Sequence, residues 1–108
     1  MGEQAETEDE LIRAARPFFG PGFGGVIRVE TTDGDRSFWV DGRGMEATVQ
    51  PHSPSGVERG FCLWRASAET LLRLFTRERR RLESAYISGR LKIAGDMSVM
   101  ARLEPVDG

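Results

Sequence analysis

Residues that could perform acid–base or nucleophilic chemistry are scarce in this chain. Its 108 residues include one histidine, His52, and one cysteine, Cys62. A reactive thiolate needs an electropositive, partly exposed setting, whereas Cys62 stands in the apolar run FCLW. We therefore interpret Cys62 as a buried structural residue, and His52, which lies between two prolines, as a loop residue.

Metal binding and hydrolysis lack the residues that they need. One histidine, one cysteine and scattered acids cannot form an ordinary tetrahedral zinc site. No serine stands in the context of a nucleophile elbow. We predict no catalytic residues, no metal and no cofactor, and hence a protein that is not an enzyme. An enzyme that uses His52 or Cys62 in a pocket is retained as the third of three hypotheses.

The segment FFGPGFGG, residues 18–25, is rich in glycine, as phosphate-binding loops are. A dinucleotide-binding loop follows a strand and opens a helix, whereas this segment follows a predicted helix and opens a predicted strand. We interpret it as a flexible bend, since glycine adopts conformations that other residues avoid. The bend carries the aromatic side chains of Phe18, Phe19 and Phe23.

Basic residues are concentrated between Arg73 and Arg81, where five arginines accompany one glutamate. The whole chain has a net charge of −2, which argues against bulk electrostatic binding of nucleic acid. The arginines form either a solvated helix face or a contact with anionic headgroups, to which each nearby base contributes about 1 kcal/mol. In the second case the membrane-surface contact residues would be Arg77, Arg80 and Arg81.

Large apolar side chains are numerous for so short a chain. They include Phe18, Phe19, Phe23, Trp39, Trp64, Phe75, Tyr86, Met97 and Met100. Part of this set must form the core, yet the final predicted helix, residues 97–104, is apolar on nearly every side. Methionine fills irregular space and suits promiscuous apolar surfaces. That helix is therefore either buried in the protein or faces an apolar molecule that the protein carries.

The elements that position these residues can be predicted from periodicity and turn signals. Thr7 and Glu10 form a capping box for a helix that we expect to end before Pro17. Two Asp-Gly pairs, at residues 33–34 and 41–42, separate the three strands of a meander.

The second half of the chain holds a strand, two helices, another strand and a final helix. We expect these elements at residues 61–65, 67–76, 77–88, 91–94 and 97–104. Ser67 and Asp96 are predicted caps, and Gly89 closes the second helix. The predicted inner stripe of that helix consists of Leu82, Tyr86 and Ile87. Five strands with helices grouped on one face define an α+β fold with a mainly antiparallel sheet.

Length and composition bound the class of protein. The chain is one domain, residues 1–108, with residues 1–6 expected to be a disordered tail. No apolar run reaches the ~18 residues of a membrane span, and the acidic first ten residues do not resemble a signal peptide. A single cysteine allows no disulfide framework. We expect a cytoplasmic protein.

The closing segment YISGRLKIAGDMSVMARL, residues 86–103, resembles the closing motif of the sterol carrier protein 2 family. That motif reads Gly-Lys-Leu-Lys-Ile-x-Gly-Asp/Asn-Met and is followed by a short apolar helix. The matching positions are Gly89, Leu91, Lys92, Ile93, Gly95, Asp96 and Met97, with Arg90 in place of the first lysine. FWVDG at residues 38–42 and ASAETLLRLFT at 66–76 resemble further family segments, so the likeness spans residues 8–104.

The resemblance implies a five-stranded sheet with helices on one side that enclose an apolar tunnel. It implies binding or transfer of fatty acyl chains, acyl-CoA, phospholipids or sterol-like molecules, without catalysis. Family members also serve as accessory domains, for instance in ubiquinone biosynthesis. Eukaryotic members often end in a peroxisomal signal, which this chain lacks, so the resemblance implies a bacterial-type stand-alone form.

We expect the final helix to form one wall of the cavity, the preceding helices the facing wall, and the glycine-rich loop a mobile mouth. The predicted lipid-binding residues are Met97, Met100, Leu103, Phe75, Leu82, Tyr86, Phe18 and Phe23. The competing hypothesis is an interaction module whose apolar face docks a partner, for instance in quinone or lipid metabolism, or a second copy of the chain. The lipid-binding hypothesis expects a monomer or a weak dimer.

Overall fold

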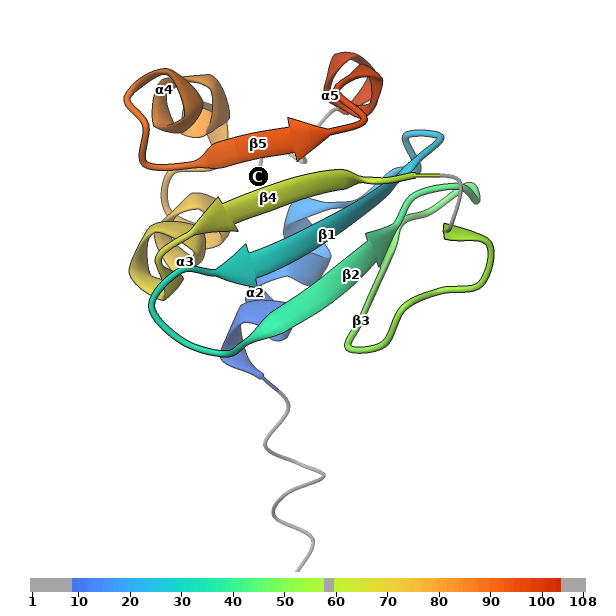
Figure 1. The fold of residues 1–108 in the computed structure, drawn as a ribbon, viewed down its shortest axis with the longest axis horizontal. Coiled ribbons are helices and arrows are strands. Elements are labelled where there is room, and N and C mark those ends of the chain that lie inside the picture. Colours follow the sequence, from blue (N-terminus) through green and yellow to red (C-terminus); the bar gives the residue numbers. More distant parts are fainter. Residues whose placement is uncertain (1–8, 58–59, 104–108) are drawn as a thin grey trace, which may run out of the picture.

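The structure, a computed structural model, describes residues 9–57 and 60–103. Within these residues, five strands form one sheet in the order β3-β2-β1-β4-β5. The strands are β1 (Val26–Thr31), β2 (Ser37–Asp41), β3 (Thr48–Gln50), β4 (Cys62–Ala66) and β5 (Lys92–Gly95). The β1–β4 pair is parallel and the other neighbouring pairs are antiparallel (Figure 1). The predicted α+β fold with a mainly antiparallel sheet is confirmed.

Helices cover one face of this sheet and flank one of its edges. They are α2 (Glu10–Phe18), α3 (Ala68–Thr76), the 3-10 turn η2 (Arg79–Arg81), α4 (Leu82–Ile87) and α5 (Ser98–Arg102). Figure 1 shows α2 and α3 behind the sheet, with α4 and α5 beside the edge strand β5. Because side chains alternate along a strand, the inner face is formed by every second residue. It includes Ile27, Val29, Phe38, Val40, Cys62 and Trp64, all of them buried.

Helix α2 begins and ends later than the sequence predicts. Its cap is Asp9, whose carboxylate accepts a hydrogen bond of 2.7 Å from the Leu11 backbone N–H. Thr7, the predicted cap, lies outside the described residues. The helix continues through Pro17 to Phe18, and the Phe19 N–H donates to the Ala15 carbonyl over 3.0 Å. Burial of Phe18 therefore outweighs the tendency of the residue before a proline to leave the helical region.

The predicted second helix, residues 77–88, is divided in two. Glu78 has non-helical backbone angles, φ −117° and ψ 44°. The chain therefore leaves the helical conformation after α3 and resumes it in η2 and α4. The break changes which residue faces inward. Ala85 is the buried residue of α4, whereas Tyr86 and Ile87 of the predicted inner stripe are 45% and 73% exposed.

The closing strand and helix lie where the motif places them. Gly89 has a φ of +84°, which confirms the predicted left-handed residue after α4. Asp96 accepts hydrogen bonds from the backbone N–H and the hydroxyl of Ser98, at 3.1 Å and 2.6 Å, and thus caps the first turn of α5. Val99 of α5 is 1% exposed and belongs to the core.

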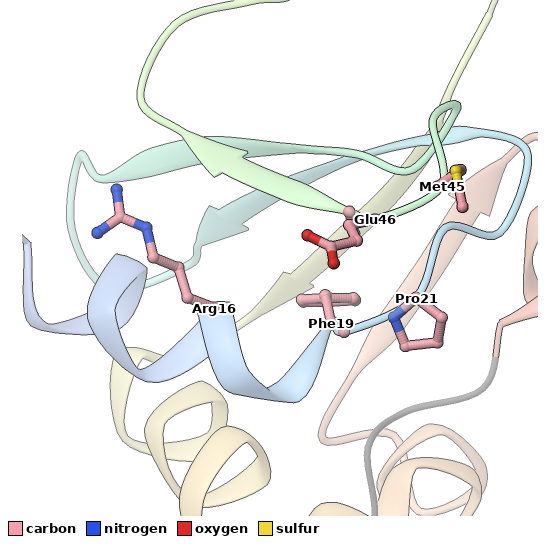
Figure 2. Close-up of a pocket in the computed structure, with 7 residues that line it drawn as sticks. Arg16, Phe19, Pro21, Met45 and Glu46 are labelled. Atoms are coloured by element: carbon pink, nitrogen blue, oxygen red, sulfur yellow. The ribbon is translucent and has the colours of Figure 1, made fainter.

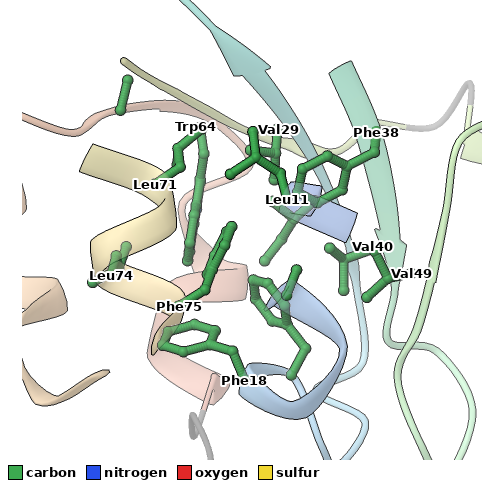
Figure 3. Close-up of a cluster of buried hydrophobic side chains, with 14 of the residues drawn as sticks. Leu11, Phe18, Val29, Phe38, Val40, Val49, Trp64, Leu71, Leu74 and Phe75 are labelled. Carbon is green, nitrogen blue, oxygen red and sulfur yellow. The ribbon is translucent and has the colours of Figure 1, made fainter. Parts of the chain in front are cut away.

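Aromatic rings fill the space between α2, α3 and the sheet (Figure 3). The ring centroid of Phe18 lies 4.8 Å from that of Phe19 and 5.2 Å from that of Phe75. Phe19 in turn lies 5.5 Å from Trp64 of β4. Each of these side chains is at most 1% exposed. Because aromatic side chains bury large areas and prefer such tilted contacts, this cluster attaches both helices to the sheet.

Gly95 and Gly89 offer a matched test of how closely β5 approaches β4. Both have left-handed φ values, +80° and +84°, but a Cβ on Gly95 would collide with the Phe61 carbonyl oxygen, whereas one on Gly89 meets no atom within 4 Å. Gly89→Ala should lower the free energy of unfolding by about 1–2 kcal/mol, the left-handed penalty alone. Gly95→Ala should cost roughly 2 kcal/mol more, because the two strands must separate. Urea unfolding measures both losses, and equal losses would contradict this packing.

Candidate functional site

The predicted lipid-binding residues fall into two groups in the structure. Phe18, Phe23 and Phe75 are buried, with exposed fractions of 0%, 4% and 0%. Phe18 and Phe75 face one another from α2 and α3 (Figure 3). These rings pack against other rings of the core, so they contribute to the packed interior. Their role as ligand contacts stays a prediction.

Phe23 lies in a loop that other segments hold closely. Its backbone N–H and that of Gly24 both donate to the Gly42 carbonyl, over 2.8 Å and 2.7 Å. The Phe23 ring covers Gly42 so closely that a Cβ there would overlap the ring. Arg102 of α5 donates from Nε to the Phe23 carbonyl over 2.9 Å. The predicted mouth is thus a fixed loop joined to α5.

The other predicted residues belong to a partly exposed set that we call the apolar rim. The rim consists of Leu82, Tyr86, Ile93, Met97, Met100 and Leu103. Leu82, Met100 and Leu103 pack against the buried core while remaining partly exposed. Tyr86 and Met97 are more exposed, at 45% and 42%.

Ile93 is a member of the rim that is not among the predicted lipid-binding residues. It pairs with Trp64 across β4 and β5, so its side chain lies on the inner, helix-covered face. It is nevertheless only half-buried and packs at the edge of the core. Alternation along the strand between exposed Lys92 and exposed Ala94 would have indicated its inward direction.

Helix α5 is fixed to the glycine-rich loop along one side. The Val99 side chain packs against Gly25, where a Cβ would lie 2.6 Å from Val99 Cγ2. Three residues later, Arg102 donates to the carbonyls of Phe23 and Gly24, over 2.9 Å and 3.2 Å. Met100 lies between these two anchors and contacts Trp64, whose indole Nε1 donates to Met100 Sδ over 3.3 Å.

Neither residue of the enzyme hypothesis has catalytic surroundings. Burial raises the pKa of the Cys62 thiol to about 11, partly opposed by the indole N–H of Trp64, so the thiol is protonated at neutral pH. His52 is exposed in a loop, and its carbonyl accepts a hydrogen bond from Gln50. Among the described residues, no cluster of histidine, cysteine and acidic side chains could hold a metal ion.

Open pockets occur elsewhere on the surface. One of about 850 Å³ lies beside the end of α2 and is lined by Arg16, Phe19, Gly20, Pro21, Met45, Glu46 and Ala47 (Figure 2). Met45 is 94% exposed at its border. A second pocket of about 460 Å³ is lined by Arg80, Glu83, Ser84, Ile87 and Ser88. None of the eight predicted lipid-binding residues lines either pocket, but Arg80, a predicted membrane contact, lines the second.

The arginines around η2 are not equivalent. Arg79 turns inward and donates from Nε to the Phe75 carbonyl over 3.2 Å. Arg77 and Arg81 are exposed. Beside them Ile87 of α4 is 73% exposed, so an apolar side chain adjoins the basic segment.

A comparison with protein families identifies the family of this chain. The model of the SCP-2 sterol transfer family matches residues 21–106. Because the match covers most of the chain, the protein belongs to the SCP-2 sterol transfer family. No curated protein matches the sequence.

Solved structures show the same fold at low sequence identity. A UbiJ-SCP2 ubiquinone synthesis protein is 24% identical and has a TM-score of 0.55, covering 89% of this chain and 76% of that one. The apo form of sterol carrier protein 2 from Yarrowia lipolytica is 18% identical with a TM-score of 0.53, covering 94% of this chain and 80% of that one.

Among the described residues, no helix has the length and apolar character to cross a membrane.

Proposed function

We propose that the protein binds a lipid at the apolar rim and transfers it without chemical change. The observation that carries the proposal is the rim itself, in which Leu82, Met100 and Leu103 pack against the core and stay partly exposed. Met97 and Tyr86 are each more than 40% exposed. Exposed apolar surface beside a core often marks a site that binds a ligand or a partner. Membership in the SCP-2 sterol transfer family supports binding or transfer of lipids in general.

The ligands that suit this site are fatty acyl chains, acyl-CoA, phospholipids or sterol-like molecules. A sixteen-carbon chain removed from water gains roughly 12 kcal/mol, at about 0.8 kcal/mol per methylene group. Ordering and association consume a large part of this gain, which leaves affinity on the order of micromolar or tighter. Side chains must move to admit the chain, and the half-buried Met100 and Leu103 can move at lower cost than the fully buried Phe18 and Phe75.

Transfer between membranes is supported by the basic segment beside the rim. Arg77 and Arg81 are exposed, and Arg80 lines the pocket next to the exposed side chain of Ile87. Arginines attract anionic headgroups, while an isoleucine can enter the boundary between headgroups and acyl chains. We propose that Arg77, Arg80 and Arg81 contact an anionic membrane. Tyr86 of the rim and Ile87 are successive residues of α4, so the site would lie close to the lipid surface.

The second candidate function uses the same rim as a protein interface. Exposed methionines such as Met97 suit adaptable protein contacts as well as lipid contacts. The structural neighbour that is named as a ubiquinone synthesis protein makes an accessory role compatible with the fold. The lipid hypothesis differs because it predicts a concentration-independent monomer, or at most a weak dimer, that binds lipid. Light scattering after size exclusion measures the oligomeric state.

Met100 variants test the lipid site against ordinary core packing. Met100→Ala should lower lipid affinity and reduce the free energy of unfolding by less than the ~2–5 kcal/mol expected for a fully packed methionine. Met100→Trp should block uptake with the fold intact. Displacement of a fluorescent fatty acid and urea unfolding measure the two effects, and Met45→Ala at a 94% exposed position is the control. Full destabilisation by Met100→Ala with unchanged uptake, together with unfolding by Met100→Trp, would show that Met100 is core.

Two paired substitutions with equal charge change test the membrane contact. Arg77→Gln with Arg81→Gln should weaken binding to phosphatidylserine vesicles roughly 30-fold, at about 1 kcal/mol for each base. The control pair is Arg13→Gln with Arg65→Gln, which removes two exposed arginines from α2 and β4. Vesicle sedimentation at constant salt measures the binding of both double variants. An equal loss of vesicle binding in the two would show that only net charge matters, and would contradict a contact at Arg77 and Arg81.

A further inference from the structure

Trp64 carries a hydrogen-bond donor with a poor partner at the border of the rim. The side chain is 0% exposed, and its Nε1 donates to Met100 Sδ over 3.3 Å. A thioether is a weak acceptor, whereas a buried indole N–H ordinarily has a full hydrogen-bond partner. Within residues 9–57 and 60–103, no oxygen or nitrogen atom accepts from this N–H.

The described side chains around the Trp64 N–H provide no strong hydrogen-bond acceptor. Cys62, the other polar neighbour on the inner face of β4, is a buried thiol on which the Trp64 N–H also acts, lowering its pKa. Its sulfur, like that of Met100, is a weak acceptor. Ile93, paired with Trp64 on β5, and Phe19, 5.5 Å away, are apolar. A buried donor without a strong acceptor costs free energy. The same donor therefore favours a molecule that brings an oxygen to it.

The Met100 side chain can leave the donor while the other contacts of α5 stay in place. Helix α5 is held through Val99 and Arg102, and neither of these contacts involves the Met100 side chain. Met100 is half-exposed, so it can turn toward solvent. Methionine is unbranched and has three rotatable side-chain bonds, so this movement is a change of rotamer.

We infer that Trp64 Nε1 donates a hydrogen bond to an oxygen atom of the bound lipid, and that Met100 Sδ occupies this position when no lipid is bound. The inference rests on the proposed lipid-binding function and specifies its ligand class. The ligand is an apolar chain that carries an acceptor oxygen, either the carbonyl of an ester or a free carboxylate. A plain hydrocarbon would bind through burial alone and would leave the donor without an oxygen.

The two indole N–H resonances of the protein permit a direct test by nuclear magnetic resonance. Trp39 lies on the opposite face of the sheet, where its ring contacts Phe61 at 4.9 Å and the guanidinium of Arg28 at 5.3 Å. Trp39→Phe assigns the two signals, and the Trp39 signal is the internal control in the native protein. The probes are methyl laurate and tetradecane, whose chains have equal length, and laurate as a third probe, all delivered from cyclodextrin.

The ester or the carboxylate should move the Trp64 indole proton downfield, because an oxygen acceptor replaces sulfur, while the Trp39 signal stays in place. Tetradecane should bind without that downfield shift. Methyl laurate should bind about fivefold more tightly than tetradecane, the ratio that one neutral hydrogen bond provides. Laurate distinguishes a free carboxylate from an ester carbonyl as the source of the oxygen.

Two substitutions separate the hydrogen bond from packing. Trp64→Phe should remove the preference for methyl laurate over tetradecane, and Met100→Leu, which removes only the sulfur acceptor, should retain it. If the probes bind and neither oxygen-bearing probe shifts the Trp64 signal downfield, the inference is wrong and lipid binding still stands. If no probe binds to the native protein, the proposed function fails and the inference fails with it. The native-protein spectra decide the question even if Trp64→Phe does not fold.

Discussion

Contact between Trp64 and its neighbours is the interaction on which both the core and the rim depend. On one side the ring meets Phe19, and through Phe19 the aromatic cluster that attaches α2 and α3 to the sheet. On another side its N–H meets Met100, which belongs to the partly exposed rim. Core and rim are therefore continuous through one fully buried side chain. A change at Met100 must therefore be accommodated next to fully buried aromatic side chains.

Helix α5 combines backbone anchors on one side with partly exposed apolar side chains. One side of the helix is anchored to the glycine-rich loop by Val99 and by the two hydrogen bonds of Arg102. Met100 and Leu103 remain partly exposed. Under the proposed function, rigid backbone anchors combined with movable apolar side chains would admit a lipid chain without local unfolding. The fully buried rings of Phe18 and Phe75 would give way only at greater cost.

Local signals in the sequence predicted the fold well, because its hairpin turn and caps are local features. Asp33-Gly34 marks the hairpin of β1 and β2, and Gly89 and Asp96 act at short range in the closing motif. Features set by tertiary contacts were missed. Burial of Phe18 carries α2 past Pro17, and the break at Glu78 rotates α4 so that Ala85 faces inward. The position of Ile93 beside Trp64, and of Met100 against its indole, depends on strand register and helix docking, which no short stretch of sequence contains.

Native mass spectrometry of the protein as expressed, before and after incubation with a fluorescent fatty acid, tests the central claim most directly. If the rim is a lipid site, a fraction of the protein should carry an added mass in the range of a lipid, and the fatty acid should bind saturably. The bound species should be lost in Met100→Trp. A bare apo mass, with no saturable uptake of the fatty acid, would contradict the account.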